Sequence, residues 1–205
     1  MPIVLNGTTG VISGVPVGGL PDGIVDTDML AANAVTAAKT SGLASVNGIT
    51  EADQWRVTSN FTFGNLAARI TSNWERVDNP SIFQKIGTGM SVDGSGNWSF
   101  PSTGKWLIMC HWIGRRSSGT NEHGQLHMYT TVNNASSWEE AAVSNVSISA
   151  NNGRGTGCFQ FIFDCQDTAN YKLHFGYYDV NGTTIFIANS LANRNSFTFI
   201  KLGET

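Results

Sequence analysis

Residues 94–107 read Gly94-Ser95-Gly96-Asn97-Trp98-Ser99-Phe100-Pro101-Ser102-Thr103-Gly104-Lys105-Trp106-Leu107. The two glycines near its start permit the positive backbone angle φ that a tight turn needs. Pro101 and Gly104 end one strand and turn the chain into the next. The large apolar residues of the stretch then lie on neighbouring strands and form one cluster; they are Trp98, Phe100 and Trp106. The stretch therefore predicts a hairpin with an aromatic corner.

Short strand-like segments continue on both sides of this hairpin. Residues 106–113 are a continuous apolar run, typical of a strand buried on both faces. Residues 159–165 and 171–177 alternate with a period of two and carry one aromatic face each. Further strands are predicted at 55–58, 82–86, 125–131, 143–149, 184–189 and 196–202. Repeated short strands with Gly and Asn turns indicate an all-β fold, a sandwich or jelly roll.

The first 50 residues differ in character, because every Trp, Tyr and Phe lies beyond Gly48. Two small β fragments are predicted, around Ile3-Val4-Leu5 and residues 11–13. Asp26-Thr27-Asp28 offers N-cap chemistry for one short Ala-rich helix over residues 29–39. Such a helix is marginal alone, so we expect it to pack against copies of itself. Residues 1–50 are thus predicted to be an attachment and trimerisation segment, and residues 51–205 a head domain.

Composition limits the partners. Only 13% of the 205 residues are charged and the net charge is -3, which argues against nucleic-acid binding. The chain has no apolar run of membrane-spanning length and does not begin like a signal peptide, so we expect synthesis in a cytoplasm and no membrane partner. Three cysteines without an export signal are expected to be free thiols, mostly buried.

Motifs of enzyme chemistry are missing: there is no phosphate-binding Gly loop, nucleophile elbow or Cys-x-x-Cys pair. His123 and His127 are expected to share one face of a strand as a surface or interface pair rather than a metal site. Glu139-Glu140 is expected to be a solvated loop rather than a glycosidase pair. Aspartates near strand ends suit Asx turns better than calcium; these are Asp164, Asp167 and Asp179. The sequence predicts no enzyme, metal or cofactor.

Two predicted loops, 114–124 and 151–157, are rich in hydrogen-bond donors and poor in apolar bulk, which suits hydroxyl-rich glycans. The alternative is that they are ordinary long loops. The candidate ligand-binding residues are Arg115, Arg116, Asn121, His123 and Arg154.

The order of landmarks in residues 86–107, with the closing strand at 196–203, resembles the complement globular-head and tumour necrosis factor superfamily. The resemblance spans about residues 52–203 and implies a jelly-roll homotrimer. Two features depart from the family: His111-Trp112 in the central strand, and the missing collagen-like repeat. The candidate core or trimer-interface residues are Trp98, Phe100, Trp106, Tyr171 and Tyr177.

Residues 3–10 and 23–35 resemble the openings of tail-fibre and other virion proteins of aquatic bacteriophages. This resemblance implies a trimeric virion protein made in the host cytoplasm and released by lysis. The candidate residues for attachment to the particle are Ile3, Val4, Leu5, Met29, Leu30 and Val35.

Together these observations predict a noncatalytic phage structural protein, a short trimeric tail fibre or receptor-binding tip. Its expected partners are itself, other virion proteins through the N-terminal segment, and host cell-surface glycans. One alternative is a capsid decoration or cement trimer, also called a head fibre. Outside that class, the alternatives are a cellular lectin-like binding module and, as a third choice, a hydrolase.

Overall fold

A computed structural model describes residues 4–6, 11–13, 48–78, 85–118 and 123–205. Its contacts divide the chain into two units, Met1–Val46 and Asn47–Thr205. In the first unit, β1 (Val4–Asn6) pairs antiparallel with β2 (Val11–Ser13). This hairpin confirms the two predicted β fragments. The predicted helix at 29–39 lies outside the described residues, as do Ile3, Met29, Leu30 and Val35.

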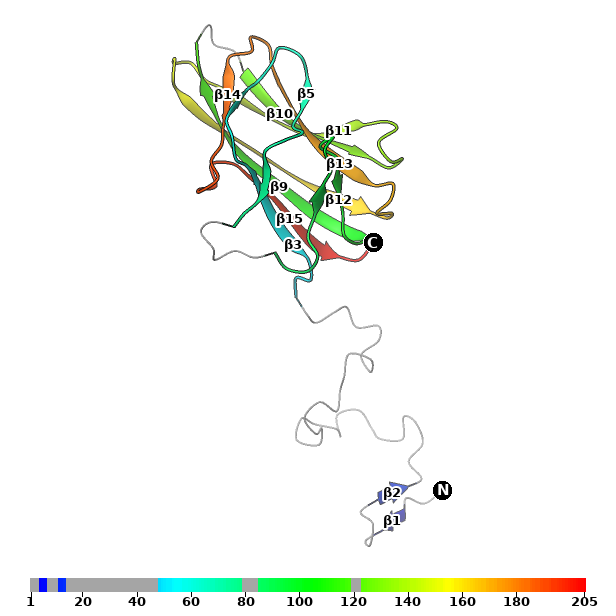
Figure 1. The fold of residues 1–205 in the computed structure, drawn as a ribbon. Coiled ribbons are helices and arrows are strands. Elements are labelled where there is room, and N and C mark those ends of the chain that lie inside the picture. The colour runs from blue at the N-terminus through cyan, green and yellow to red at the C-terminus, as the bar shows by residue number, and fades with distance from the viewer. Residues whose placement is uncertain (1–3, 7–10, 14–47, 79–84, 119–122) are drawn as a thin grey trace. The chain divides into compact units, whose positions relative to one another are not determined.

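The head consists of two antiparallel sheets (Figure 1). In the first sheet the strand order is β4-β14-β9-β15-β3-β6. In addition, β12 pairs antiparallel with β9 along nearly the whole length of both strands. Its strands are β3 (Ala52–Val57), β4 (Phe61–Thr62), β6 (Trp74–Arg76), β9 (Gly104–Arg116), β12 (Arg154–Cys165), β14 (Thr184–Ile187) and β15 (Ser196–Gly203).

In the second sheet the order is β11-β10-β13-β8-β7, and the short β5 also pairs with β13. Its strands are β5 (Ala68–Arg69), β7 (Ser91–Val92), β8 (Trp98–Ser99), β10 (His123–Thr131), β11 (Glu139–Ser147) and β13 (Lys172–Asp179). No helix occurs among the described residues, and the predicted all-β jelly-roll sandwich is confirmed.

The core between the sheets is built around aromatic rings. Trp98 is fully buried and meets Trp55 and Trp74 edge to face, with ring centroids 5.1 and 4.8 Å away. The predicted hairpin is wrong, because β8 pairs with β7 and β13 in the second sheet whereas β9 belongs to the first, so the chain crosses from one sheet to the other between them. Beside this crossing, the ring centroid of Phe100 lies 5.3 Å from that of Trp106 and 5.4 Å from that of Phe163. Edge-to-face and offset rings are the favourable arrangements for aromatic pairs. The predicted aromatic corner is therefore part of the core itself.

The turn before this corner depends on one of its two glycines. Gly96 has a φ of 78°, and a Cβ atom there would lie 2.5 Å from the carbonyl oxygen of Ile70. Any other residue at position 96 would meet both backbone strain and this close approach. Gly94 does not have a positive φ, so only half of the sequence expectation for this turn holds.

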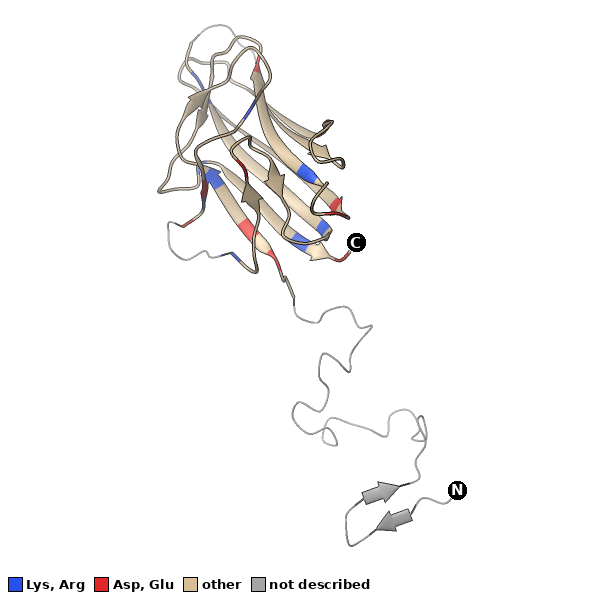
Figure 2. Cartoon of the chain, turned by 45° about the vertical axis from the view of Figure 1, so that its right-hand side comes forward, with Lys and Arg blue, Asp and Glu red and all other residues tan. Residues whose placement is uncertain are grey.

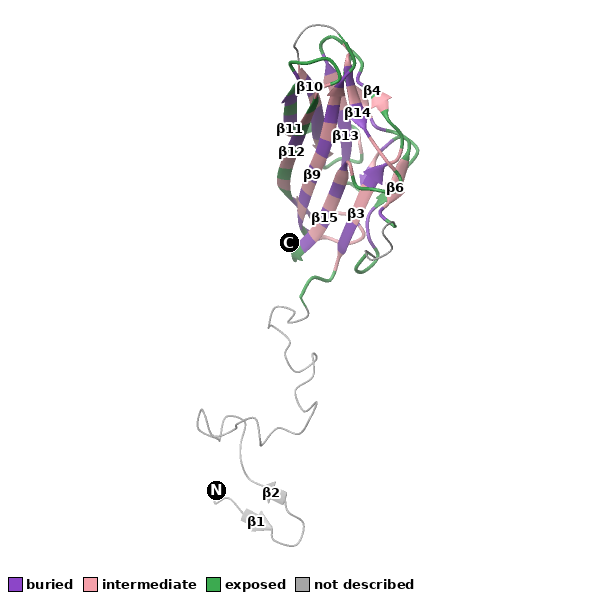
Figure 3. Cartoon of the chain, turned by 90° about the vertical axis from the view of Figure 1, so that its left-hand side faces the viewer, coloured by how far each residue is buried: buried purple, intermediate pink, exposed green. Residues whose placement is uncertain are grey.

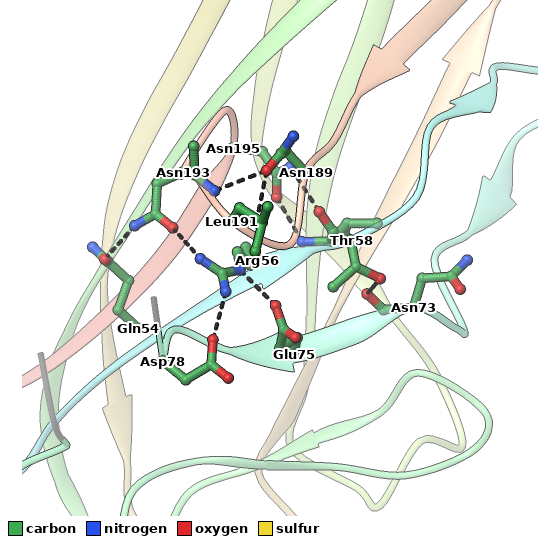
Figure 4. Close-up of polar contacts among 12 residues, drawn as sticks. Gln54, Arg56, Thr58, Asn73, Glu75, Asp78, Asn189, Leu191, Asn193 and Asn195 are labelled. Atoms are coloured by element: carbon green, nitrogen blue, oxygen red, sulfur yellow. Dashed lines mark hydrogen bonds and ion pairs between the residues drawn. The ribbon is translucent and has the colours of Figure 1, made fainter. Parts of the chain in front are cut away.

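A polar network fixes β3 to the segment that precedes β15 (Figure 4). The guanidinium of Arg56 is fully buried and donates to Glu75 and Asp78, each at 2.6 Å, and to Asn193 at 3.2 Å. Asn195, also fully buried, accepts from the backbone N–H of Val57 and donates to its carbonyl. A buried charge is tolerated only when it is paired and hydrogen-bonded, as it is here. The network therefore holds one border of the first sheet in place.

Candidate functional site

The outward side of β9 is the main candidate for a binding surface. Along this strand Trp106, Ile108, Cys110 and Trp112 are buried in the core. Side chains alternate between the two faces of a strand, so the residues between them point away from the core. They are only partly buried in the single chain, and Figure 3 shows the resulting alternation along β9 and β15.

Strand register places these residues in rows with neighbours from β12 and β15. Leu107 lies opposite Ile162 and Ile200, and the next row joins Met109 to Gln160 and Thr198. The third row joins His111 to Cys158 and Ser196. We call this surface the β9 face; it consists of Leu107, Met109, His111, Ile113, Cys158, Gln160, Ile162, Ser196, Thr198 and Ile200.

The β9 face itself contains no Lys, Arg, Asp or Glu, and such residues lie opposite one another at both of its ends. Lys105 lies opposite Asp164 at one end, and Arg115 lies opposite Arg154 at the other. Figure 2 shows how few charged positions the strands carry. Ile162, on β12, is 58% exposed. The β9 face thus combines one apolar row, that of Leu107, with uncharged polar side chains in the next two rows, and depletion of charge is typical of the core of a protein–protein interface.

The β9 face corrects one expectation. The apolar run at 106–113 predicted a strand buried on both faces, yet one chain buries only the face toward the core. Apolar side chains without a covering layer lose the stabilisation that burial would give them. A strand of this composition is therefore fully buried only if another molecule covers its second face.

The predicted ligand-binding residues do not form one loop surface. Arg115 and Arg116 belong to β9, and Asn121 lies outside the described residues. His123 begins β10, and Arg154 begins β12 with its side chain exposed. The prediction for Arg116 is wrong: it is 2% exposed, and its Nη1 donates to the carbonyl of Ile148 at 2.8 Å. The strand continues through both arginines, so Arg116 faces the protein.

The predicted core or interface aromatics lie within or against the core. Trp98, Phe100 and Trp106 are buried. Tyr171 and Tyr177 are half-buried and pack against the same cluster. None of the five belongs to the β9 face. The signal for that face was the apolar strand at 106–113, which sequence reasoning assigned to the core alone.

A second candidate is a hollow of about 240 Å³ on the second sheet. Its lining comes from β10, β13, β5 and the residue before β5: Ala67, Ala68, Arg69, His127, Tyr129, His174, Gly176 and Tyr177. Tyr129 stacks between His127 and His174, with centroid distances of 5.8 and 4.8 Å. Trp138 meets His174 edge to face at 4.3 Å. The hollow is therefore bordered by a continuous series of rings.

The ionisable groups at this hollow differ in their partners and in their pKa values. Nδ1 of His127 lies 2.7 Å from a carboxylate oxygen of Glu140. Burial, and secondarily Arg69, lowers the pKa of His174 to about 3, so its ring is neutral at pH 7. Burial and Glu140 raise the pKa of Tyr129. Glu139 and Glu140 are exposed to solvent, as expected, but they do not form a loop: both begin β11, and Glu140 reaches across to His127 of β10.

The three thiols are free, as predicted, with Cys110 and Cys165 buried and Cys158 exposed. Burial raises the pKa of Cys110 well above its usual value and that of Cys165 to about 11. Asp167 and Asp179 accept backbone N–H groups two residues ahead, as Asx turns do. Within the described ranges no three His, Cys, Asp or Glu side chains form a group able to hold a metal ion.

A search for membrane-crossing helices found none in the part of the chain that the structure describes. No protein-family model and no curated protein matches the sequence.

Solved structures do resemble the head. The Eiger TNF of S. frugiperda matches with a TM-score of 0.55 and 9% identity, over 75% of this chain and 93% of that one. Murine APRIL at pH 5.0 matches with a TM-score of 0.52 and 10% identity, over 74% and 98%. The PRD1 vertex protein P5 gives 0.46 and 14%, over 76% and 99%, a score too low to support an inference. At such identities the first two likenesses show the fold alone, a jelly roll of the tumour necrosis factor type.

Proposed function

We propose that this chain is a noncatalytic virion protein that assembles as a homotrimer through the β9 face. The observation that carries the proposal is the row of Leu107, Ile162 and Ile200, which the single chain leaves partly uncovered. Copies of the same chain are the simplest cover, because a closed ring of identical subunits buries the same surface on each. The virion as its location is proposed from the resemblance of residues 3–10 and 23–35 to phage virion proteins.

Self-association would also protect the edge of the first sheet. In the described residues β12 pairs with β9 on one side only. An unpaired strand edge is prone to unwanted pairing with other chains, and natural proteins cover such edges. A trimer packed around the β9 face would bring neighbouring chains close to this edge. One assembly would thus cover both the apolar rows and the strand edge.

Within that class we propose a short tail fibre or receptor-binding tip, with residues 1–50 attached to the particle and the head facing outward. Three identical weak sites on one trimer would bind a surface glycan polymer with increased avidity. A capsid decoration trimer is the second candidate. It shares the trimer and the N-terminal attachment, but residues 1–45 would lie across capsomer boundaries and the head would bind no ligand.

Imaging intact particles by electron cryo-microscopy tests this proposal. A trimer projecting from the tail supports the receptor-binding role, and trimers at capsomer boundaries support decoration. Absence of the chain from every particle would contradict a virion role and favour a cellular lectin-like module.

A further inference from the structure

We propose that the hollow beside Arg69 is a binding site for a carboxylate-bearing sugar, such as a uronic acid unit of a surface glycan. The inference rests on the proposed glycan-binding role and names its site and ligand class. None of the predicted ligand-binding residues lines the hollow. His123 comes nearest to it in the chain, because it begins β10, the strand that supplies His127 and Tyr129.

The guanidinium of Arg69 has N–H donors that make no hydrogen bond within the described residues. Nη1 of Arg69 donates to the side chain of Asn97 at 2.6 Å, and the guanidinium lies 4.8 Å from the ring centroid of Trp138. Among the described residues Arg69 makes no ion pair, and its Nε and Nη2 form no hydrogen bond. By contrast, Arg56 and Arg76 are paired with carboxylates. A planar guanidinium whose Nε and Nη2 are both free to donate is suited to bind a carboxylate at both oxygens.

Nearby carboxylates are already engaged. Glu140 is bound to His127, and one oxygen of Asp93 accepts the backbone N–H groups of Ser95 and Asn97. The other oxygen of Asp93 accepts from the side chain of Asn97. Lys172 does not line the hollow, and its ammonium donates to Ser99. A ligand carboxylate would therefore find a cationic group that no protein carboxylate contacts directly.

Two histidine residues that line the hollow each have one ring nitrogen without a hydrogen-bond partner among the described residues. His174 is 7% exposed and His127 is 9% exposed, and both line the hollow. Nδ1 of His174 and Nε2 of His127 have no hydrogen-bond partner among the described residues. A buried polar atom without a partner is costly, but neither nitrogen is accessible as the rings lie, so a ligand hydroxyl group could bond to it only after the ring rotates toward the hollow. Hydroxyl groups beside a carboxylate are the chemistry of an acidic sugar.

The volume of the hollow and a glycine in its lining also suit a single sugar unit. At about 240 Å³ it is smaller than a typical drug-sized pocket, so it suits one sugar unit rather than a long segment. Gly176 contributes to the lining without a side chain. A Cβ atom at this position would lie 3.2 Å from the carbonyl oxygen of Ala68 and 3.4 Å from the ring of Tyr129. Alanine at position 176 would therefore reduce the space without removing any charge.

The test uses the full-length protein and two probes, glucuronate and neutral methyl glucoside, with affinities measured from NMR chemical shifts. Arg69→Gln removes the charge, Gly176→Ala narrows the hollow, and Arg154→Gln removes an exposed arginine of β12 as the matched control. Thermal unfolding checks that each variant is folded. We expect glucuronate to bind the wild type more tightly than methyl glucoside, with a loss of about tenfold or more in Arg69→Gln. Gly176→Ala should also weaken binding, and Arg154→Gln should leave it unchanged.

Equal affinity for the two sugars, unchanged binding by folded Arg69→Gln, or no binding of glucuronate would each overturn the inference. These outcomes are separable from failure of the proposed function. A trimer found on the particle that ignores glucuronate contradicts only the acidic-sugar site. Glucuronate binding by a protein absent from particles contradicts only the virion role.

Discussion

Ile162 lies directly opposite Leu107 in the pairing of β12 with β9, and it remains 58% exposed. Such an exposed apolar side chain, on an edge strand and beside a second apolar residue, lacks the covering that burial would provide. The proposed trimer resolves this, since each copy supplies the layer that the others lack.

Replacing Ile162 by Asp should dissociate the trimer. A carboxylate in a closed apolar interface would be desolvated without a partner. The free energy lost in this way would exceed the free energy that the apolar contact contributes to the trimer. Sedimentation velocity should show a single chain. Val132→Asp is the matched control, because Val132 is 57% exposed but lies outside the β9 face. A trimer that survives Ile162→Asp would place the interface elsewhere.

Thiol titration should report the same assembly. Cys158 is the exposed thiol and belongs to the β9 face, whereas Cys110 and Cys165 are buried with raised pKa values and carry little reactive thiolate. We expect no fast-reacting thiol in the native wild type and one per chain in Ile162→Asp, measured with a disulfide reagent. A fast thiol in the wild type would mean that the β9 face is open.

Among the aromatic residues of the stretch 94–107, Trp98 should be the most costly to remove. It is fully buried and contacts rings from β3, β6, β13 and β15. Trp98→Ala should lower the free energy of unfolding by about 3–5 kcal/mol, as expected for a large core cavity. Trp138→Ala, at a half-exposed ring, serves as the comparison in denaturant titrations. Equal losses in the two variants would contradict the assignment of Trp98 to the core.

Stability should decrease on mild acidification because of His174. Its folded pKa of about 3 lies below the ordinary value of 6.5, so between these values the unfolded chain binds a proton that the folded chain does not. The free energy of unfolding should therefore fall as pH drops below 6.5, by at most about 1.4 kcal/mol per pH unit. Asp93, Asp167 and Asp179 have lowered pKa values and contribute only below about 3.8.

The measurement is denaturant unfolding at pH 7, 6 and 5 and at constant protein concentration, because self-association shifts apparent stability. His174→Gln should flatten the dependence over this range. Parallel curves for the wild type and the variant would show that another group is responsible.

The head should fold without the first unit. Contacts separate Met1–Val46 from Asn47–Thr205, and the aromatic core lies in the second unit. A fragment of residues 47–205 should unfold at the same temperature as the full chain in calorimetry. A clearly lower midpoint would mean that the N-terminal segment stabilises the head.

The all-β class and the clustering of Trp98, Phe100 and Trp106 could be predicted because they depend on local signals: a period of two, Gly and Pro turns, and rings close together in the sequence. The crossing found in place of the hairpin could not, since Pro101 and Gly104 mark a turn but do not show that the chain crosses from one sheet to the other there. The β9 face could not, since an apolar strand does not reveal whether the same chain or another copy covers each face. Arg116 was misplaced because adjacent arginines resemble loop donors, and nothing local shows that β9 continues through them.

The hollow was also beyond local reasoning. It depends on contacts between separate strands, such as Arg69 from β5 beside His174 from β13. A register shift between Met128 and Tyr129 places Glu140 opposite Tyr129 in the pairing of β10 with β11. Such a shift has no clear mark in the sequence, so the pairing of Glu140 with His127 could be found only in the fold.

The central claim is the homotrimer, and native mass spectrometry of the full-length protein tests it most directly. The account predicts a species of three times the chain mass of 22.0 kDa. A protein that stays at the mass of one chain across the accessible concentrations would contradict it, because the β9 face would then be exposed to water.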